Sequence, residues 1–374
     1  MKSQPDEKKK ILVITPDPPW TIGGVEKIIP ETLKYLKDVF DITIYSSADS
    51  TVQLGEFLWK GIPVMVFKDN LPPYRLSLPL YKALKDKREI SLIHAHNYST
   101  FIPLLSRLAC KDVPFIINSH FHESGSSTVN SILRKFYDLF IGPRTLLAAD
   151  MVVCNSRSEE SLISRKFRGL KRTCVIYNGA AIDELRNARP FDIKLKKVVL
   201  SVSRLVRYKH VHLILHALQH LPEEYEAVII GKGPEIKNLI KLTSKLGLEK
   251  RVKMLGNLSD EEVHRWYRTA AVFMQLSGIE SFGLTPIEAL AAGTPVVAND
   301  DKGGLKETID IFQPDILAVD VMKDSPRQIA QAIEKASYMQ LSGDLATKLD
   351  KFKCEYISHE FAELYNQVIK TRKT

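Results

Sequence analysis

Two acidic residues, Glu280 and Glu288, flank a short glycine-containing loop in the second half of this 374-residue chain. The loop, Ser281–Leu284, precedes a helical pattern in which Thr285 is a favourable N-cap and Pro286 suits the first helical position. Unpaired N–H groups and the positive end of a helix dipole attract a phosphate at such a place. An anion-binding loop with an acid on either side suits a substrate that is linked to a nucleotide.

The same residues also fit a purely structural interpretation. In Thr285-Pro286-Ile287-Glu288 the Glu288 carboxylate could bond the N–H of Thr285 and form a capping box. The spacing alone does not choose between the capping box and a ligand site. Gly293 ends the helical pattern, and the apolar segment 294–298 is typical of a buried strand.

Two adjacent glycines, Gly23 and Gly24, follow the first predicted strand at 11–15. Glycine at such a position lets the backbone approach a phosphate and opens the next helix. The pattern is not GxGxxG, so the sequence disfavours a dinucleotide site. A plain tight turn explains the pair equally well.

Two cations, Arg204 and Lys209, come just after another predicted strand, at 198–202. Cations beyond a strand end can neutralise a diphosphate leaving group, with Arg as a bidentate donor and Lys as a point charge. Solvated surface cations are the alternative, because most Lys and Arg side chains lie in water.

Four histidines stand at the ends of two neighbouring predicted strands. His94 and His96 end one strand, and His120 and His122 follow the next. A single histidine at a strand end is usually structural, but two pairs at neighbouring ends make a pocket at least as good an explanation. Neither pair has the flanking carboxylate of a pattern such as HExxH, so no metal site is predicted.

The bulk properties are those of a globular protein of about two domains. Hydrophobic residues make up 44% of the chain and charged residues 26%. The four cysteines are scattered without metal-binding spacing, which suits a reducing compartment. The apolar run 11–14 is too short for a signal-peptide core, and no later run approaches the ~18 apolar residues of a membrane span. We therefore expect a cytoplasmic protein.

The formal net charge of +9 is distributed unevenly. Residues 1–188 carry +6 of it and the remainder +3. Such a surplus suits nucleic acid, anionic lipid or a phosphorylated substrate. No zinc-finger, helix-turn-helix or RNA-binding signature accompanies the charge, so nucleic acid is not predicted as a partner.

One segment of the first half, 129–147, combines apolar residues with Arg134, Lys135 and Arg144. It fits an interfacial helix that lies on an anionic membrane surface. A buried core helix is the alternative, because the apolar stripe is broad and Gly142-Pro143 interrupts it. The first interpretation predicts a peripheral protein on the inner membrane face.

Apolar strand-like runs alternate with helical patterns such as 209–221 and 261–271 along the whole chain. Because the runs are apolar throughout, they predict parallel strands covered on both faces. The sequence thus predicts two doubly wound α/β sheets, with ligands outside the carboxyl ends of their strands. The predicted strands are 11–15, 41–45, 64–67, 92–95, 115–118, 151–154, 173–176, 198–202, 227–230, 252–255, 272–275, 295–298 and 316–319.

The polar segment 181–197, with Pro190 at its middle, is the predicted boundary between the two sheets. The last segment, 355–370, shows amphipathic periodicity. Its predicted apolar face carries Tyr356, Phe361, Leu364, Tyr365 and Ile369.

Together these motifs resemble glycosyltransferase family 4, the retaining enzymes with the GT-B fold. The most specific likeness is to the E-x7-E motif, through Glu280 and Glu288. Two motifs depart from the family pattern: Tyr177 replaces the usual Pro in V-I-P-N-G, and His210 stands where Gly is usual after R-L-x-x-x-K. The other matching segments are Gly23-Gly24, 92–96, 118–120, 175–179, 204–209 and 227–234, which contains the GxGP element with Gly231.

The resemblance implies two Rossmann-like domains facing across a cleft. Residues 1–188 would form the acceptor-side domain, and 189–354 the domain that binds a nucleotide-diphosphate sugar. Residues 355–374 would form a helix that returns to pack on the first domain. No cofactor or metal is implied, and the acceptor would be a glycan, a lipid-linked group or another hydroxyl compound.

The resemblance also assigns roles to individual residues. Arg204 and Lys209 would hold the diphosphate, Glu288 the ribose hydroxyls and Glu280 the transferred sugar. His120 would lie beside that sugar, and His94, His96 and His122 on the acceptor side. The remaining donor-binding residues would be Gly23, Gly24, Gly231, Ser281, Phe282, Gly283, Leu284 and Thr285.

The implied reaction is a metal-independent, retaining hexosyl transfer. Cations aimed at the leaving phosphate oxygen would be its main source of rate. Because fold alone does not fix function, an isomerase or phosphorylase on the same architecture is an alternative. A non-catalytic subunit that stabilises a partner transferase is another, and that interpretation predicts a damaged motif.

Overall fold

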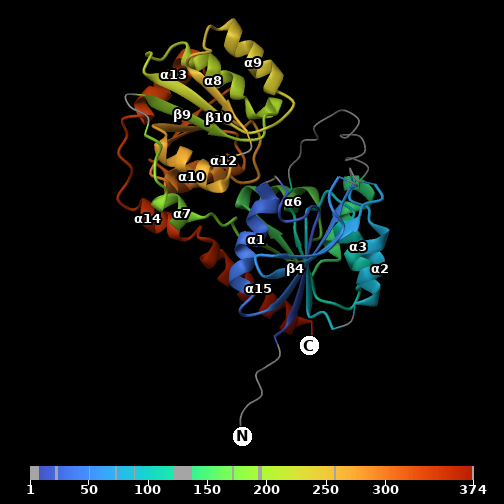
Figure 1. The fold of residues 1–374 in the computed structure, drawn as a ribbon. Helices are drawn as coiled ribbons and strands as arrows, with labels where there is room; N and C mark the ends of the chain where they lie inside the picture. The colour runs from blue at the N-terminus through green and yellow to red at the C-terminus, as the bar shows by residue number, and fades with distance from the viewer. Residues whose placement is uncertain are drawn as a thin grey trace. The chain divides into compact units, whose positions relative to one another are not determined.

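The computed structural model describes residues 8–21, 24–49, 51–71, 74–87, 89–121, 137–170, 172–192, 196–256 and 258–372. The chain divides into two compact units. The first comprises Met1–Gly179 and Cys354–Thr374, and the second Ala180–Lys353. Each contains one sheet that is wholly or mainly parallel, with helices on both faces, as predicted (Figure 1).

Within the described residues, the first sheet has eight strands in the order β3-β4-β2-β1-β5-β6-β7-β8. All neighbours except β3 and β4 run parallel. All seven strands predicted for this half are present. The strands are β1 (Lys10–Thr15), β2 (Asp41–Ala48), β3 (Gly55–Trp59), β4 (Ile62–Lys68), β5 (Leu92–His96), β6 (Phe115–Asn118), β7 (Met151–Cys154) and β8 (Thr173–Val175).

The strand that the sequence did not predict, β3, lies at the edge of the first sheet. Its residues alternate between half-buried and exposed, so it lacks the apolar run of the other strands. It pairs antiparallel with β4 across the two residues Lys60 and Gly61, both of which have positive φ angles. Such a turn matches the twist of a tight hairpin.

Helices cover the two faces of the first sheet with separate apolar clusters. One face packs against α1 (Gly24–Leu36) and α15 (Cys354–Thr371), which lie side by side (Figure 1). The other face carries α2 (Leu78–Asp86), α3 (Ile102–Ala109), α5 (Gly142–Leu147) and α6 (Arg157–Lys166).

The C-terminal helix α15 thus belongs to the first unit, although the second unit precedes it in the chain. Phe361, Leu364, Tyr365 and Ile369 are buried in the cluster that contains residues of β1 and β2. Tyr356, which the sequence placed on the same face, is 48% exposed. The buried positions at this end of α15 are Cys354, Ile357, Ser358 and Phe361, and Tyr356 lies outside their three- and four-residue spacing, so it projects away from the sheet.

The second sheet has six parallel strands among the described residues, in the order β11-β10-β9-β12-β13-β14. All six were predicted. The strands are β9 (Lys197–Val202), β10 (Tyr225–Ile230), β11 (Val252–Leu255), β12 (Val272–Gln275), β13 (Val296–Asn299) and β14 (Ile316–Val319).

Two groups of helices pack with this sheet (Figure 1). The first group is α8 (Val211–Leu218), α9 (Ile236–Lys245) and α13 (Pro326–Ala336). The second is α7 (Ile182–Asn187), α10 (Asp260–Thr269), α11 (Leu284–Ala291), α12 (Gly304–Phe312) and α14 (Leu345–Asp350). A short 3-10 helix, η2 (Arg207–Lys209), precedes α8.

The first unit ends at Gly179, earlier in the chain than the predicted residue 188. The difference comes from α7, which lies inside the segment expected to be a linker. Its Ile182 and Leu185 are buried, and the helix packs against α10 and α11. These two apolar side chains and the ion pair of Arg186 with Asp350 hold α7 to the second unit.

Candidate active site

The strand order of the second sheet reverses at the neighbours β9 and β12. Ligands of open parallel sheets bind outside the carboxyl ends of the strands at such a switch point. Arg204 and Lys209 follow β9, and Glu280 follows β12. The structure therefore places these three predicted residues beyond the carboxyl ends of two neighbouring strands at the centre of the sheet.

Glu280 is held from three sides. Its carboxylate forms an ion pair with Lys209 and accepts a hydrogen bond from Gln275 Nε2 at 2.6 Å. Its backbone N–H donates to Asp301 Oδ2 at 3.1 Å. Burial raises the pKa of Asp301, and backbone N–H bonds from Gly303 and Lys306 oppose that shift. The side chains of Lys209 and Glu280 are only 13% and 17% exposed, so water screens their charges incompletely.

Arg204 is exposed, and its Nη2 donates to the Tyr208 hydroxyl at 3.1 Å. A glycine loop supports the backbone that carries it. A Cβ atom on Gly231 would lie 1.9 Å from the Ser203 carbonyl oxygen, and one on Gly233 2.2 Å from that of Leu205. Only glycine permits this close approach of two chain segments. Gly231 thus supports Arg204 through the backbone.

Glu288 accepts a 2.8 Å hydrogen bond from the hydroxyl of Tyr267, which is fully buried. Burial and the Glu288 charge together raise the pKa of Tyr267 well above its usual value. The capping-box interpretation is wrong, since α11 begins at Leu284 and Gly283 is its N-cap, without a side-chain cap bond. Thr285 lies inside the first turn of α11 and is not its N-cap. Glu288 lies in the next turn, where its carboxylate contacts Tyr267. Gly293 ends the helix with φ +79°, as predicted.

The loop before α11 differs from the prediction of unpaired amides. Gly283 N–H donates to Thr308 Oγ1, and Leu284 N–H to the Phe282 carbonyl, each at 3.2 Å. The cause is close packing on α12: a Cβ atom on Gly304 would lie 2.3 Å from the Ser281 carbonyl oxygen. A bound phosphate would have to replace these two internal bonds.

In the first unit the strand order reverses at β1 and β5. Gly24 begins α1 just after β1, and Gly23 lies outside the described residues. His94 and His96 belong to β5, and His120 follows β6. His122 also lies outside the described residues.

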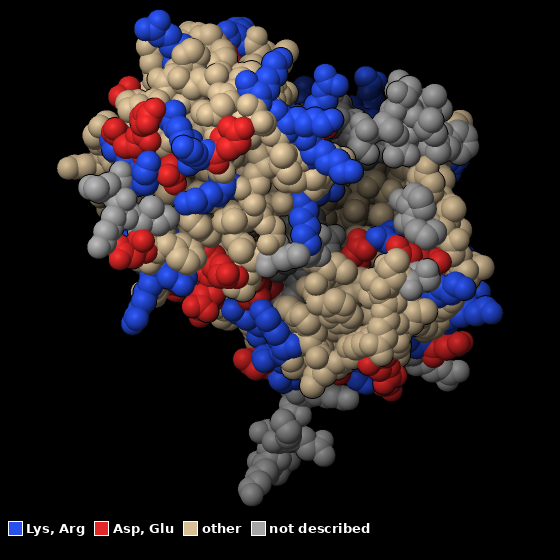
Figure 2. Space-filling model, turned by 45° about the horizontal axis from the view of Figure 1, so that its top comes forward, with Lys and Arg blue, Asp and Glu red and all other residues tan. Residues whose placement is uncertain are grey.

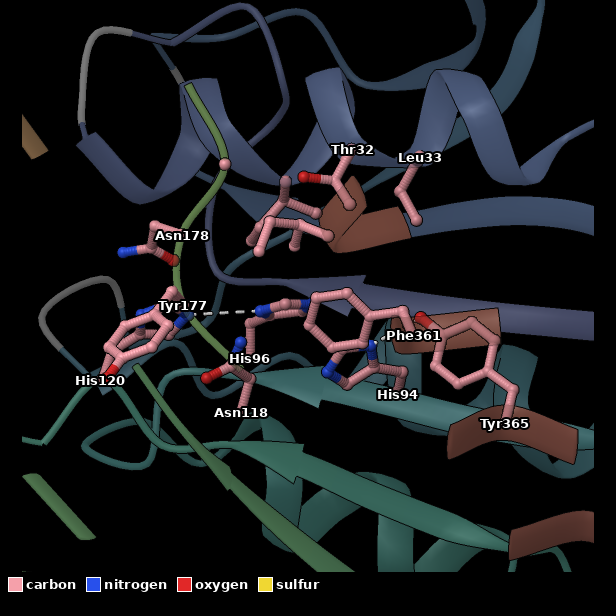
Figure 3. Close-up of a pocket in the computed structure, with 13 residues that line it drawn as sticks. Thr32, Leu33, His94, His96, Asn118, His120, Tyr177, Asn178, Phe361 and Tyr365 are labelled. Carbon is pink, nitrogen blue, oxygen red and sulfur yellow. Dashed lines mark hydrogen bonds between the residues drawn. The ribbon is translucent and has the colours of Figure 1, made fainter. Parts of the chain in front are cut away.

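The three described histidines of this edge form a row that ends at Tyr365 of α15 (Figure 3). His96 Nδ1 lies 3.2 Å from His120 Nε2, and His94 Nδ1 lies 2.8 Å from the Tyr365 hydroxyl. The rings of His94 and His96 are 4.2 Å apart between centroids. The other ring nitrogen of His120 lies 2.8 Å from Asn155 Nδ2.

Burial keeps two members of this row, His94 and His96, electrically neutral. It lowers the pKa of His94 to about 3 and that of His96 well below its usual value, and the neighbouring histidines add to both shifts. The Nε2 atoms of His94 and His96 are buried and have no hydrogen-bond partner within the described part of the chain. His94 also packs against Phe361, which places it in the interior. The pocket beside the row includes Thr32, Asn118 and Tyr177 (Figure 3).

Sequence reasoning missed five residues that hold the predicted ones: Asn155, Glu159, Tyr267, Gln275 and Asp301. Three of them, Asn155, Gln275 and Asp301, could have been found, because each ends or closely follows a strand that the sequence did predict. The other two lie on helices and face inward, which a single sequence does not reveal. Among the described residues, no three His, Cys, Asp or Glu side chains gather as a metal ion requires.

The protein thus has two Rossmann-like units, and each carries polar or charged side chains at the switch point of its sheet. The model of Glycosyltransferase Family 4 matches residues 22–184, and that of Glycosyl transferases group 1 matches residues 183–351. The chain belongs to glycosyltransferase family 4, has the GT-B fold, and is an enzyme that transfers sugars.

Curated relatives align along most of the chain. It is 26% identical to the N-acetylgalactosamine-N,N'-diacetylbacillosaminyl-diphospho-undecaprenol 4-alpha-N-acetylgalactosaminyltransferase of Campylobacter jejuni, over 83% of this chain and 86% of that enzyme. It is also 26% identical to an alpha-1,3/1,6-mannosyltransferase of Dictyostelium discoideum, over 82% and 85% of the two chains.

Solved structures share the fold. A sucrose-phosphate synthase from Thermosynechococcus elongatus superposes with a TM-score of 0.80 at 20% identity, over 97% of this chain and all of that one. Anabaena HepE, in complex with UDP and glucose, superposes with a TM-score of 0.75 at 23% identity, over 96% and 100%. No described helix is both long and apolar enough to cross a membrane.

Proposed function

We propose that this enzyme transfers a hexose from a nucleotide-diphosphate sugar to a glycan or lipid-linked acceptor, with retention of anomeric configuration. The observation that carries the proposal is the grouping of Arg204, Lys209 and Glu280 at the β9/β12 switch point. The HepE complexes, which contain UDP and glucose or UDP-glucose, support a nucleotide-sugar donor.

Breaking the glycosidic bond leaves a diphosphate and a sugar with oxocarbenium character. Arg204 and Lys209 act on the negative charge that grows on the leaving oxygen. Arg204 is exposed and its guanidinium offers several donors, so it can bind two phosphate oxygens at once. Lys209 supplies a compact charge, and it exchanges part of its pairing with Glu280 for the phosphate.

The two acids take different parts in this proposal. Glu280, fixed by Gln275 and by its own N–H bond to Asp301, holds hydroxyl groups of the transferred sugar. Glu288 holds the ribose hydroxyls with the carboxylate that Tyr267 orients. His120 contacts the transferred sugar as a hydrogen-bonding group, and the diphosphate is neutralised by protein cations without a metal ion.

Retention by double displacement requires a carboxylate nucleophile beside the anomeric carbon. The residues assigned above already have other roles. We therefore propose transfer on one face of the sugar, in which the leaving phosphate accepts the proton of the incoming hydroxyl.

The Campylobacter relative, whose name includes a diphospho-undecaprenol acceptor, supports a lipid-linked acceptor. The segment predicted to meet a membrane, 129–147, is described only from Tyr137 onward. There Tyr137 is buried, whereas Leu139 and Phe140 are 68% and 45% exposed. Two exposed apolar side chains beside the basic Arg144 suit peripheral contact with anionic lipid on the cytoplasmic side.

The surface drawn in Figure 2 is not uniformly basic. On the face drawn in Figure 2, acidic side chains lie among the Lys and Arg side chains. Mixed charge of this kind attracts an anionic surface less strongly than an unbroken basic patch.

The test is a panel of nucleotide sugars, assayed for transfer to polyprenyl-diphosphate glycans and for the configuration of the product. Turnover with one donor and a product of unchanged configuration support the proposal. An inverted product contradicts the retaining mechanism, and a complete lack of turnover or nucleotide binding contradicts the proposed reaction.

A further inference from the structure

His120 occupies a backbone conformation that its surroundings must enforce. Its φ angle is +46°, in the left-handed region, which residues other than glycine adopt uncommonly. Strained backbone of this kind persists where neighbouring groups over-determine it. The groups that hold His120 therefore control where its imidazole lies.

The buried carboxylate of Glu159, in the first turn of α6, binds both neighbours of His120. Glu159 is 2% exposed. Its Oε1 accepts hydrogen bonds from the Ser119 hydroxyl, at 2.6 Å, and from the Phe121 N–H. The residues on either side of His120 are thus tied to one oxygen atom.

The second oxygen of Glu159 reaches the residue that bonds the His120 ring. Glu159 Oε2 accepts from the Asn155 N–H at 2.7 Å. The Asn155 side-chain nitrogen lies 2.8 Å from His120 Nδ1. One carboxylate therefore fixes the backbone of His120 on both sides and also the partner of its imidazole.

An ordinary helix-capping role does not explain these contacts. An acid in the first turn of a helix stabilises that helix through its own N–H groups and dipole. Ser119, Phe121 and Asn155, which donate to Glu159, all lie outside α6. The helix end already has a side-chain cap, since Ser156 Oγ accepts from the Glu159 N–H at 3.0 Å.

We propose that Glu159 is a positioning residue, which holds the His120 imidazole in place for the transferred sugar. The inference rests on the proposed function, in which His120 contacts that sugar. Gln at position 159 would keep the shape but turn one acceptor into an amide donor facing N–H or O–H groups. Such a contact is repulsive, so it would release the loop at Ser119 and Phe121 or at Asn155.

The test is a double-mutant cycle on kcat between Glu159→Gln and His120→Ala. We expect Glu159→Gln to lower kcat about tenfold to a hundredfold while nucleotide affinity stays unchanged, because misplacing a contact group is costly. In the His120→Ala background the same substitution should change kcat less than about twofold, because nothing is left to position. An equal loss in both backgrounds overturns the inference, and so does an unchanged kcat in either single variant.

Two further variants keep the test decisive. Ser119→Ala removes one donor only, and it replaces Glu159→Gln in the cycle if that variant does not fold. Glu160→Gln is the matched control: the neighbouring acid accepts from Thr173 Oγ1 at 2.8 Å, away from the His120 loop. It should leave kcat unchanged.

Imidazole NMR separates this inference from the proposed function. In the wild-type protein the His120 ring should hold one tautomer, fixed by Asn155. In Glu159→Gln the two tautomers should average, and in Glu160→Gln they should not. A single tautomer in all three proteins overturns the role of Glu159. A chain without transferase activity contradicts the proposed function, while these spectra still decide on Glu159.

Discussion

The two switch points of this enzyme are built from opposite kinds of chemistry. The first unit presents two buried, neutral histidines beside His120, and the second presents a cation paired with an acid beyond the ends of two neighbouring strands. Burial lowers the pKa of His94 and His96, so the first site carries no charge from them at neutral pH. In the second, Lys209 and Glu280 both retain partial contact with water.

This difference indicates which interactions each site contributes. Neutral imidazoles bind hydroxyl groups without a large desolvation cost, which suits a sugar or an acceptor alcohol. A cation that can leave its carboxylate partner is suited to stabilise charge that appears only during the reaction. Substitutions in the second unit should therefore act on turnover and nucleotide binding, and buried histidine substitutions on stability.

The largest effect is expected from Lys209→Ala. Removing a cation from the developing phosphate charge typically lowers turnover by ~10²–10³, or about 3–4 kcal/mol. The fold should survive, because the Glu280 carboxylate keeps its hydrogen bond from Gln275. Steady-state kinetics with the preferred donor is the measurement, with Lys241→Ala, an exposed residue of α9, as the control. Near-normal turnover in Lys209→Ala and Arg204→Ala would refute the assignment of the diphosphate site.

A smaller effect is expected from Glu288→Gln. Hydrogen bonds to a charged group contribute about 1.5–3 kcal/mol, so nucleotide affinity should fall roughly tenfold to a hundredfold. Calorimetry with a nucleoside diphosphate and with its 2'-deoxy and 3'-deoxy analogues locates the contact. The variant should lose the preference for ribose that the wild-type enzyme shows.

Tyr267→Phe is the matched variant, because it removes only the hydroxyl that orients Glu288. It should weaken ribose discrimination less than Glu288→Gln does. A Glu288→Gln protein that still prefers ribose by the wild-type factor would contradict the ribose assignment.

The sequence predicted the strands well because both sheets are buried on their two faces. An apolar run such as 272–275 allows few other structures. The sequence-based prediction missed β3, because the alternating residues of that strand carry a weaker signal. It also misplaced the start of α11. Thr285 and Pro286 are good residues for a helix start, but the packing of Gly304 against Ser281 moves the first turn.

The candidate site was predictable as far as its residues end strands. Four of the predicted residues end a strand or follow the carboxyl end of one: Arg204, Glu280, His96 and His120. Their partners were not predictable, since a bond such as Gln275 to Glu280 depends on side-chain direction. The pairing of Lys209 with Glu280 joins residues far apart in the chain, and periodicity carries no such information.

Acid should destabilise the first unit through its histidines. In the unfolded chain a histidine has a pKa near 6.5, whereas that of folded His94 is about 3. Below pH 6.5 the unfolded state therefore binds a proton that the folded state does not, and the free energy of unfolding falls as pH falls. The loss by pH 5 should be about 2 kcal/mol for His94, and His96, whose pKa burial also lowers, should add to it in the same direction.

Urea denaturation at pH 7.5 and pH 5 measures this loss. His94→Gln should reduce the difference between the two pH values by about 2 kcal/mol. His359→Gln, at an exposed position of α15, is the control and should leave the difference unchanged. Equal acid sensitivity in wild type and His94→Gln would show that burial of His94 does not control it.

The smallest effect concerns membrane contact, where each basic residue near an anionic surface contributes about 1 kcal/mol. Arg144→Ala should therefore weaken binding to anionic vesicles about fivefold at low salt, and Lys241→Ala, in the second unit, should not. Replacing the exposed Leu139 by Asp should weaken it further, because that side chain would meet the lipid directly. Vesicle flotation at rising salt is the measurement, since screening must weaken any electrostatic attachment. Equal, negligible binding of the wild-type enzyme to anionic and neutral vesicles would eliminate that attachment and favour an acceptor reached from solution.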